Sequence, residues 1–150
     1  MHPLPHHYRV TATASQNGDI PVTSAGLPPL ATAAPIEFDG PGGRWSPEEL
    51  LVAAVADCFA LTFRGIARAS KFEWTHLRCD VTGTLERIDR VTQFTRIDLT
   101  AHVQIPDAAH EDQARRIAIK AEETCLITRS LKAGVFLEVN VAMAAAAVAR

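Results

Sequence analysis

The sequence predicts an α+β fold in which an antiparallel sheet packs against a long central helix and a second helix. Residues 50–60 are apolar except for Asp57, which is typical of a helix buried on several sides. Two later segments alternate apolar and polar residues, as half-buried strands of an antiparallel sheet do. With 150 residues, of which 47% are hydrophobic, the chain can bury one core, so a single domain over residues 1–150 is expected.

The first forty residues favour short strands and turns. The stretches QNGD and FDGPGG are turn signals, and YRVTATA is one of the short β-favouring pieces near them. One hairpin and one further strand are expected here. The segment SAGLPPLATAAP shows a weak pattern and is interpreted as a loop.

The start of the central helix has a clear signature. Ser46 suits the N-cap, Pro47 suits the first helical position, and Glu49 stands where a capping box places its carboxylate. We expect this helix to run to about Ser70.

Two strands should follow, joined by a turn near IDRV. Their core-facing residues are Leu77, Cys79, Val81, Gly83 and Leu85 in the first strand, and Ile97, Leu99, Ala101, Val103 and Ile105 in the second.

The last third of the chain should form two helices and a strand. The segment DAAHEDQARRIAIKAEE has its apolar residues at the spacing of an amphipathic helix. Thr124 is interpreted as the cap of a further short helix, CLITRSLK, which ends at Gly134. A final strand is expected over residues 135–143, and the Ala-rich residues 144–150 fit no element.

Composition restricts the partners. A net charge of −2 without clustered basic residues gives no basis for binding nucleic acid or an acidic membrane surface. No uninterrupted apolar run reaches the roughly 18 residues that span a bilayer, and the first residues lack the apolar core of a signal peptide. A cytoplasmic protein is expected, in which three cysteines are structural, metal-bound or reactive rather than a disulfide framework. The histidines lack the spacing of a zinc site, so no metal or cofactor is expected.

The three cysteines differ in their settings. Cys79 shares a core-facing strand face with Leu77 and Val81, so a structural role is expected. Cys58, considered without the other cysteines, would also be expected to have a structural role. Cys125, however, would lie in the first turn of the helix capped by Thr124, where unpaired N–H groups favour a thiolate. Two thiols in this arrangement are typical of a peroxidatic and a resolving cysteine.

Three stretches carry a family resemblance: SPEELLVAAVADCFALTF, EETCLITRSLK about seventy residues later, and FLEVNV after it. From Phe38 onward the chain resembles the OsmC/Ohr family of osmotically inducible and organic-hydroperoxide-resistance proteins. The resemblance implies a thiol peroxidase in which Cys58 attacks the peroxide and Cys125 closes a disulfide. It also implies an intertwined homodimer with active sites at the interface, and an external dithiol reductant, such as a lipoylated protein or a small thiol.

The resemblance further matches Glu48 to the glutamate that the family has at the start of this helix. Ten positions separate Glu48 from Cys58, which is about 15 Å along a straight helix. Either the helix is broken, or the glutamate of one subunit serves the cysteine of the other. The alternative is a solvent-exposed first-turn carboxylate favoured by the helix dipole.

The chain departs from the family in one respect. Peroxidase members use an N-terminal arginine to stabilise the thiolate, whereas the matching position here is Gln16 or Glu37. Without a cation, Cys58 would keep a high pKa in apolar surroundings. The arginines considered as substitutes are Arg9, Arg44, Arg64 and Arg129, each with the alternative of a solvated surface charge.

Two other functions stay open at this stage. The missing arginine favours a non-catalytic module of the same fold that binds a hydrophobic ligand or senses oxidants. A purely structural role for all three cysteines would leave them inert to peroxide and to alkylating reagents.

Overall fold

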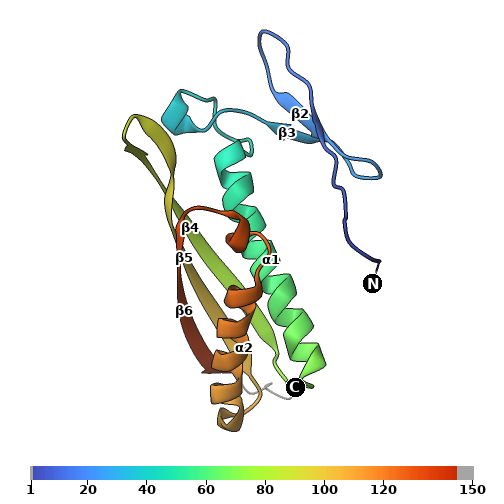
Figure 1. Ribbon diagram of the computed structural model, residues 1–150, viewed down its shortest axis with the longest axis vertical. Coiled ribbons are helices and arrows are strands. Elements are labelled where there is room, and N and C mark those ends of the chain that lie inside the picture. The colour runs from blue at the N-terminus through green and yellow to red at the C-terminus, as the bar shows by residue number, and fades with distance from the viewer. Residues whose placement is uncertain (1, 145–150) are drawn as a thin grey trace, which may run out of the picture. The chain divides into compact units, whose positions relative to one another are not determined.

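The computed structural model describes residues 2–144, so most of the Ala-rich end lies outside the described residues. The chain forms two compact units, which are divided between Leu51 and Val52 (Figure 1). Helix α1, Pro47–Ala69, begins in the first unit and continues in the second. The single domain over residues 1–150 stays a prediction.

The first unit contains a small antiparallel sheet in the order β1-β2-β3. Its strands are β1 (Thr11–Ala12), β2 (Ile20–Thr23) and β3 (Leu30–Thr32), and the expected hairpin joins β1 to β2. The loop expected at SAGLPPLATAAP is wrong in part, because β3 lies within it. Its three residues are too few for a periodic pattern, and pairing with β2, including the bond from the Thr32 hydroxyl to the Ile20 carbonyl (2.9 Å), forms the strand.

The chain then leads into α1 through a short 3-10 helix, Ile36–Phe38. A parallel bridge between Thr32 and Trp45, with an N–H bond from Ala33 to the Trp45 carbonyl (3.1 Å), connects β3 to the segment before α1. The capping box is confirmed: the Glu49 N–H donates to the Ser46 hydroxyl (3.1 Å), and the Ser46 N–H donates to the Glu49 carboxylate (2.9 Å).

Helix α1 is long and apolar. By length and composition alone it could cross a membrane, with a mean hydropathy of 1.8 over an 18-residue window, although core helices of soluble proteins pass the same test. Asp57 and Arg64 interrupt the apolar run of this helix. Its fully buried residues recur every fourth position, at Val55, Phe59, Phe63 and Ala67, and form one stripe along the helix.

The second unit is built on a three-stranded sheet in the order β4-β5-β6. Strands β4 (His76–Ile88) and β5 (Val91–Ile105) form the expected antiparallel pair. They are joined at Asp89 and Arg90, which both have positive φ, as a two-residue turn of this kind requires.

The expectation of a wholly antiparallel sheet is wrong, because β6 (Gly134–Met143) pairs parallel to β5. A parallel neighbour requires a crossover that returns the chain to the end where β5 began. The expected second helix, α2 (Glu111–Thr124), forms most of that crossover. The α+β class itself is confirmed.

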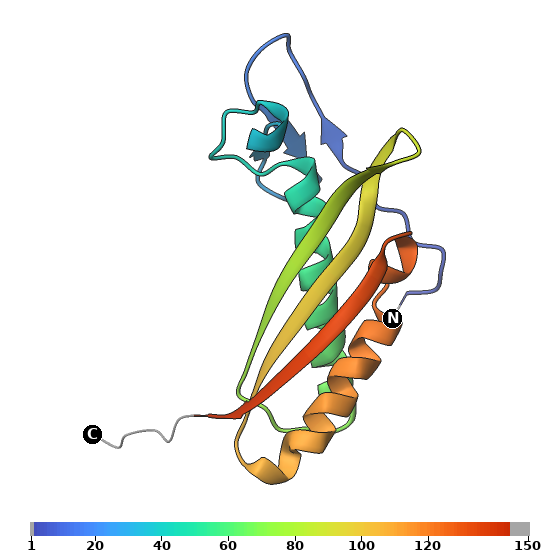
Figure 2. The same cartoon turned by 90° about the vertical axis from the view of Figure 1, so that its left-hand side faces the viewer.

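One core joins the sheet to both helices. Figures 1 and 2 show α1 and α2 on the same face of the β4-β5-β6 sheet. Gly83 permits a close approach of α1 to β4, since a Cβ there would lie 2.7 Å from the Phe94 ring and 2.8 Å from the Val52 side chain. The buried residues of β5 are Ile97, Leu99, Ala101, Val103 and Ile105, and those of α2 are Ala114, Ile117, Ala118 and Ala121.

Ser46→Ala tests the capping box. The substitution removes the acceptor of the Glu49 N–H at a fully buried position, so the free energy of unfolding should fall by about 1 kcal/mol. Urea unfolding at one protein concentration measures it. Ser15→Ala, at an exposed position, is the matched control, and equal stability of the two variants would contradict the assignment.

Candidate functional site

Cys58 lies in the middle of α1 with its side chain half-buried. Thr62 follows one turn later, and its hydroxyl donates to the Cys58 carbonyl at 2.7 Å. The same hydroxyl is also close enough to the sulfur to act on its pKa. Cys58 therefore has a polar neighbour on its own helix.

Cys125 is fully buried and follows the last residue of α2. The expectation that Thr124 caps a new helix is wrong. The Thr124 hydroxyl donates back to the Lys120 carbonyl (2.7 Å), and the Cys125 N–H donates to the Glu122 carbonyl (3.1 Å), so α2 continues to this point. Cys125 therefore lies at the negative end of a helix dipole, and the expected stabilisation of its thiolate by a helix start does not apply.

The second unit brings these two thiols together. Helix α2 ends at Thr124, and the residues that follow it, Cys125 to Ile127, lie near Cys58 of α1. The two thiols are close enough to shift the pKa of each other, and both cysteines are free thiols. Two of the three predicted site residues thus share one location.

Opposing influences set the pKa of Cys58. Burial is the largest single influence and raises it. Hydrogen bonds together outweigh burial, so the pKa of Cys58 lies below its ordinary value. The groups that lower this pKa, in decreasing order of effect, are the main chain of Ile127, the Cys125 side chain, the main chain of Leu126 and the Thr62 side chain.

The pKa of Cys125 is displaced in the other direction. Burial raises it most, and the bond to Cys58 raises it further, because ionising Cys125 would remove that bond and place two negative charges side by side. The main chain of Thr128, the second-largest influence, and its side chain lower the pKa, but burial and Cys58 together outweigh them. In the reduced pair, Cys58 is therefore the thiol that ionises first, and Cys125 is the one that keeps its proton.

Cys79 is the third free thiol and lies elsewhere. It packs against the core from β4, beside Leu77 and Val81, as predicted. Burial, assisted by the charge of Asp80, raises the pKa of Cys79 to about 11. This thiol is therefore protonated at neutral pH and poorly reactive.

Glu48 lies in the first turn of α1, within the first unit. Its side chain is half-buried rather than solvent-exposed, and its Oε2 is buried without a hydrogen-bond donor among the described residues. Buried carboxylate oxygens are normally paired, so Glu48 has unused capacity to accept a hydrogen bond. Its role towards Cys58 stays a prediction.

Two of the four candidate arginines have other partners. Arg44 pairs with Asp19 at 2.6 Å, and Arg129 donates to the Glu123 carbonyl at 3.1 Å. Arg9 and Arg64 are exposed. Within residues 2–144, the groups that shift the pKa of Cys58 are hydrogen-bond donors of the main chain and of uncharged side chains, and none is a cation.

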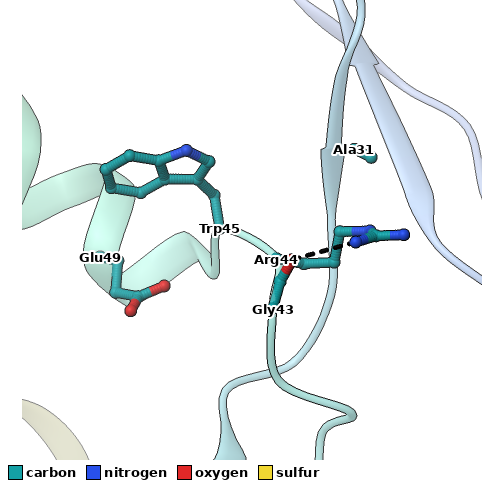
Figure 3. A pocket seen from close by; sticks show the side chains of 5 residues that line it. All are labelled: Ala31, Gly43, Arg44, Trp45 and Glu49. Carbon is teal, nitrogen blue, oxygen red and sulfur yellow. Dashed lines mark hydrogen bonds between the residues drawn. The ribbon is translucent and has the colours of Figure 1, made fainter.

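A shallow pocket of about 370 Å³ lies in the first unit and contains none of the cysteines. Figure 3 shows the five residues that line it: Ala31, Gly43, Arg44, Trp45 and Glu49. The Arg44 guanidinium is held by Asp19 and the Gly43 carbonyl, and Glu49 serves the capping box. Because these polar groups already have partners, we assign the candidate site to the thiol pair. The described part of the chain holds no group of three His, Cys, Asp or Glu side chains suited to a metal.

Sequence reasoning missed the donors to Cys58. The Leu126 and Ile127 N–H groups belong to the main chain and leave no residue-type signature. Thr62 did have a signal, since it stands four residues after Cys58 and so lies on the same helix face.

Comparisons with known proteins agree with this arrangement of helices and sheet. The family model described as OsmC-like protein matches residues 40–140. The uncharacterized protein YmaD of Bacillus subtilis is 27% identical over 139 residues, which cover 90% of this chain and 93% of YmaD. Peroxiredoxin OsmC of Escherichia coli is 31% identical over 103 residues, which cover 67% of this chain and 69% of that protein.

Solved structures share the fold. An OsmC-like protein of unknown function from Vibrio cholerae has a TM-score of 0.83 at 18% identity, covering 90% of this chain and 99% of that one. An organic hydroperoxide resistance protein OsmC from Legionella pneumophila has a TM-score of 0.71 at 24% identity. The match covers 93% of this chain and 99% of that one. Since the family model covers about two thirds of the sequence, this chain belongs to the OsmC-like protein family.

Proposed function

We propose that this protein is a thiol-dependent peroxidase that reduces organic hydroperoxides or hydrogen peroxide with Cys58 and Cys125. Membership of the OsmC-like family and the likeness to a peroxiredoxin indicate a redox role. The observation that carries the proposal is the pair of neighbouring thiols with opposite pKa shifts. A low-pKa thiol suits the attacking role, because the thiolate is the nucleophile.

The proposed cycle has three balanced steps. The Cys58 thiolate attacks the terminal peroxide oxygen and the O–O bond breaks, which leaves a Cys58 sulfenic acid and, after protonation, an alcohol or water. The Cys125 sulfur then attacks the Cys58 sulfur and releases water, so that a disulfide forms. An external dithiol reduces the disulfide by exchange and becomes oxidised itself. A lipoylated protein or a small thiol would serve as this reductant.

The proposal includes a homodimer in the cytoplasm. Only 22% of the apolar window of α1 is buried within the chain, and Leu61 on this helix is 49% exposed, which supports a covering partner subunit. In the dimer, Glu48 would position the peroxide or the thiolate of the other subunit. Its buried and unpaired Oε2 supports an acceptor role.

One observation favours a second function, that of a non-catalytic module that senses oxidants or holds a hydrophobic ligand. No cation acts on Cys58 among the described residues, whereas the family resemblance implies an arginine. A module that is oxidised once, as a sensor or while holding a hydrophobic ligand, does not need repeated turnover. Such a protein would lose its thiols to peroxide stoichiometrically without sustained peroxide consumption.

Cysteine variants separate the roles under steady-state turnover with a dithiol. Cys58→Ser should abolish peroxide consumption, with a loss of at least about a hundredfold, because the nucleophile is gone. Without the dithiol, Cys125→Ser should still consume one equivalent of peroxide but should not form the intramolecular disulfide. Cys79→Ser is the control and should keep wild-type activity. Sustained turnover by Cys58→Ser would reject the proposal.

The pKa shifts predict an order of alkylation. A lowered pKa means that the thiolate is already present at a lower pH, so Cys58 should react with iodoacetamide at a lower pH than Cys125 or Cys79. Cys79 should reach half-maximal reactivity only near pH 11. Mass spectrometry of labelled peptides follows each site. If Cys125 reacted before Cys58, the assigned roles would be wrong.

A further inference from the structure

The turn between β1 and β2 places an asparagine directly before a glycine. Asn17 and Gly18 belong to the stretch QNGD, and both residues are exposed. Gly18 has φ +94°, a conformation that glycine adopts without strain. A Cβ at Gly18 would meet nothing within 4 Å, so open space surrounds its main chain. Neither burial nor a neighbouring side chain shields the peptide bond between the two residues.

Hydrogen bonds hold the ends of this turn but leave its middle free. Thr13 donates its N–H to the Pro21 carbonyl (3.2 Å), and the Arg44 guanidinium donates to the Asp19 carboxylate (2.6 Å). Among residues 2–144, neither the Gly18 N–H nor the Asn17 carboxamide has a hydrogen-bond partner. The Gly18 nitrogen and the Asn17 side chain are therefore free to approach each other.

An exposed asparagine before a glycine reacts without an enzyme. The Gly18 main-chain nitrogen loses its proton and attacks Cγ of Asn17, and ammonia leaves as the bond from Cγ to the side-chain nitrogen breaks. A cyclic succinimide results. Water then opens the ring at the bond to Cγ, which gives aspartate, or at the bond to the main-chain carbonyl carbon, which gives isoaspartate. One water is consumed and one ammonia is released, so no oxidant or reductant is required.

We propose that Asn17 is a site of spontaneous deamidation, at which isoaspartate and aspartate form in the turn between β1 and β2. The inference goes beyond the proposed peroxidase function and does not depend on it. A carboxylate replaces a neutral amide, so the net charge of −2 falls by one. The new charge stands two residues from Asp19, which pairs with Arg44, and isoaspartate also adds one carbon to the main chain of the turn.

Asn140 is the only other asparagine in the sequence and serves as an internal comparison. It lies within β6 and is paired with His102 of β5. Its Nδ2 donates to the Glu138 carboxylate (3.1 Å), and the residue after it is the β-branched Val141. A sheet strand holds the backbone extended, and the branched side chain restricts it further, so the Val141 nitrogen is not free to attack the Asn140 side chain.

The experiment incubates the folded wild-type chain at mildly alkaline pH and follows its peptides by mass spectrometry, with separation of isoaspartate from aspartate. The peptide that contains Asn17 should lose its amide, and both products should form. The peptide that contains Asn140 should keep its amide. Ion-exchange chromatography of the intact protein should show an acidic species that grows in step with the loss at Asn17.

Asn17→Gln is the matched variant, because it keeps an exposed amide but needs a larger ring to react. It should abolish the acidic species while circular dichroism and the thermal midpoint stay those of wild type. A parallel incubation of wild type in urea measures the loss at Asn17 when no fold is present, and the folded protein should match it.

An Asn17 amide that stays unchanged in the folded protein would overturn the inference, because the fold would then protect the pair. Formation of aspartate without isoaspartate would overturn the succinimide route, since water opens that ring at either carbonyl. An acidic species that persists in Asn17→Gln would place the modification elsewhere and overturn the assignment.

Discussion

The parallel pairing of β6 with β5 is the constraint on which the candidate site depends. It forces the chain to cross from one end of the sheet to the other, and α2 makes most of that crossing. The helix and the following turn pack on the same sheet face as α1, so Cys125 arrives beside Cys58. If a simple antiparallel hairpin joined these strands, α2 would be absent. Neither a helix end nor a second thiol would then lie against α1.

The environment of Cys58 balances two opposing effects. An apolar helix removes water from the thiol, which disfavours the thiolate. Neighbouring main-chain and side-chain groups, Cys125 among them, outweigh this effect on the pKa, and none of them carries a positive charge. Neutral dipoles are therefore a way to combine a reactive sulfur with apolar surroundings.

Much of the fold could be predicted because the signals are local. The capping box from Ser46 to Glu49 set the start of α1, and the alternation in β4 and β5 identified both strands. The direction of β6 could not be predicted, because a strand has the same alternation whichever way it pairs. Thr124 was misread because a threonine can cap a new helix or donate back to its own last turn, and the continuation of α2 through this residue decides between them. The choice of Cys58 and Cys125 came from residue type and order, whereas their N–H donors have no signature in the sequence.

The central claim is that Cys58 and Cys125 are a redox pair. The most direct measurement treats the reduced wild-type protein with one equivalent of cumene hydroperoxide and maps disulfides by mass spectrometry. The account predicts one intramolecular disulfide between Cys58 and Cys125, with Cys79 remaining a free thiol. Three unchanged thiols, or a disulfide that includes Cys79, would contradict it.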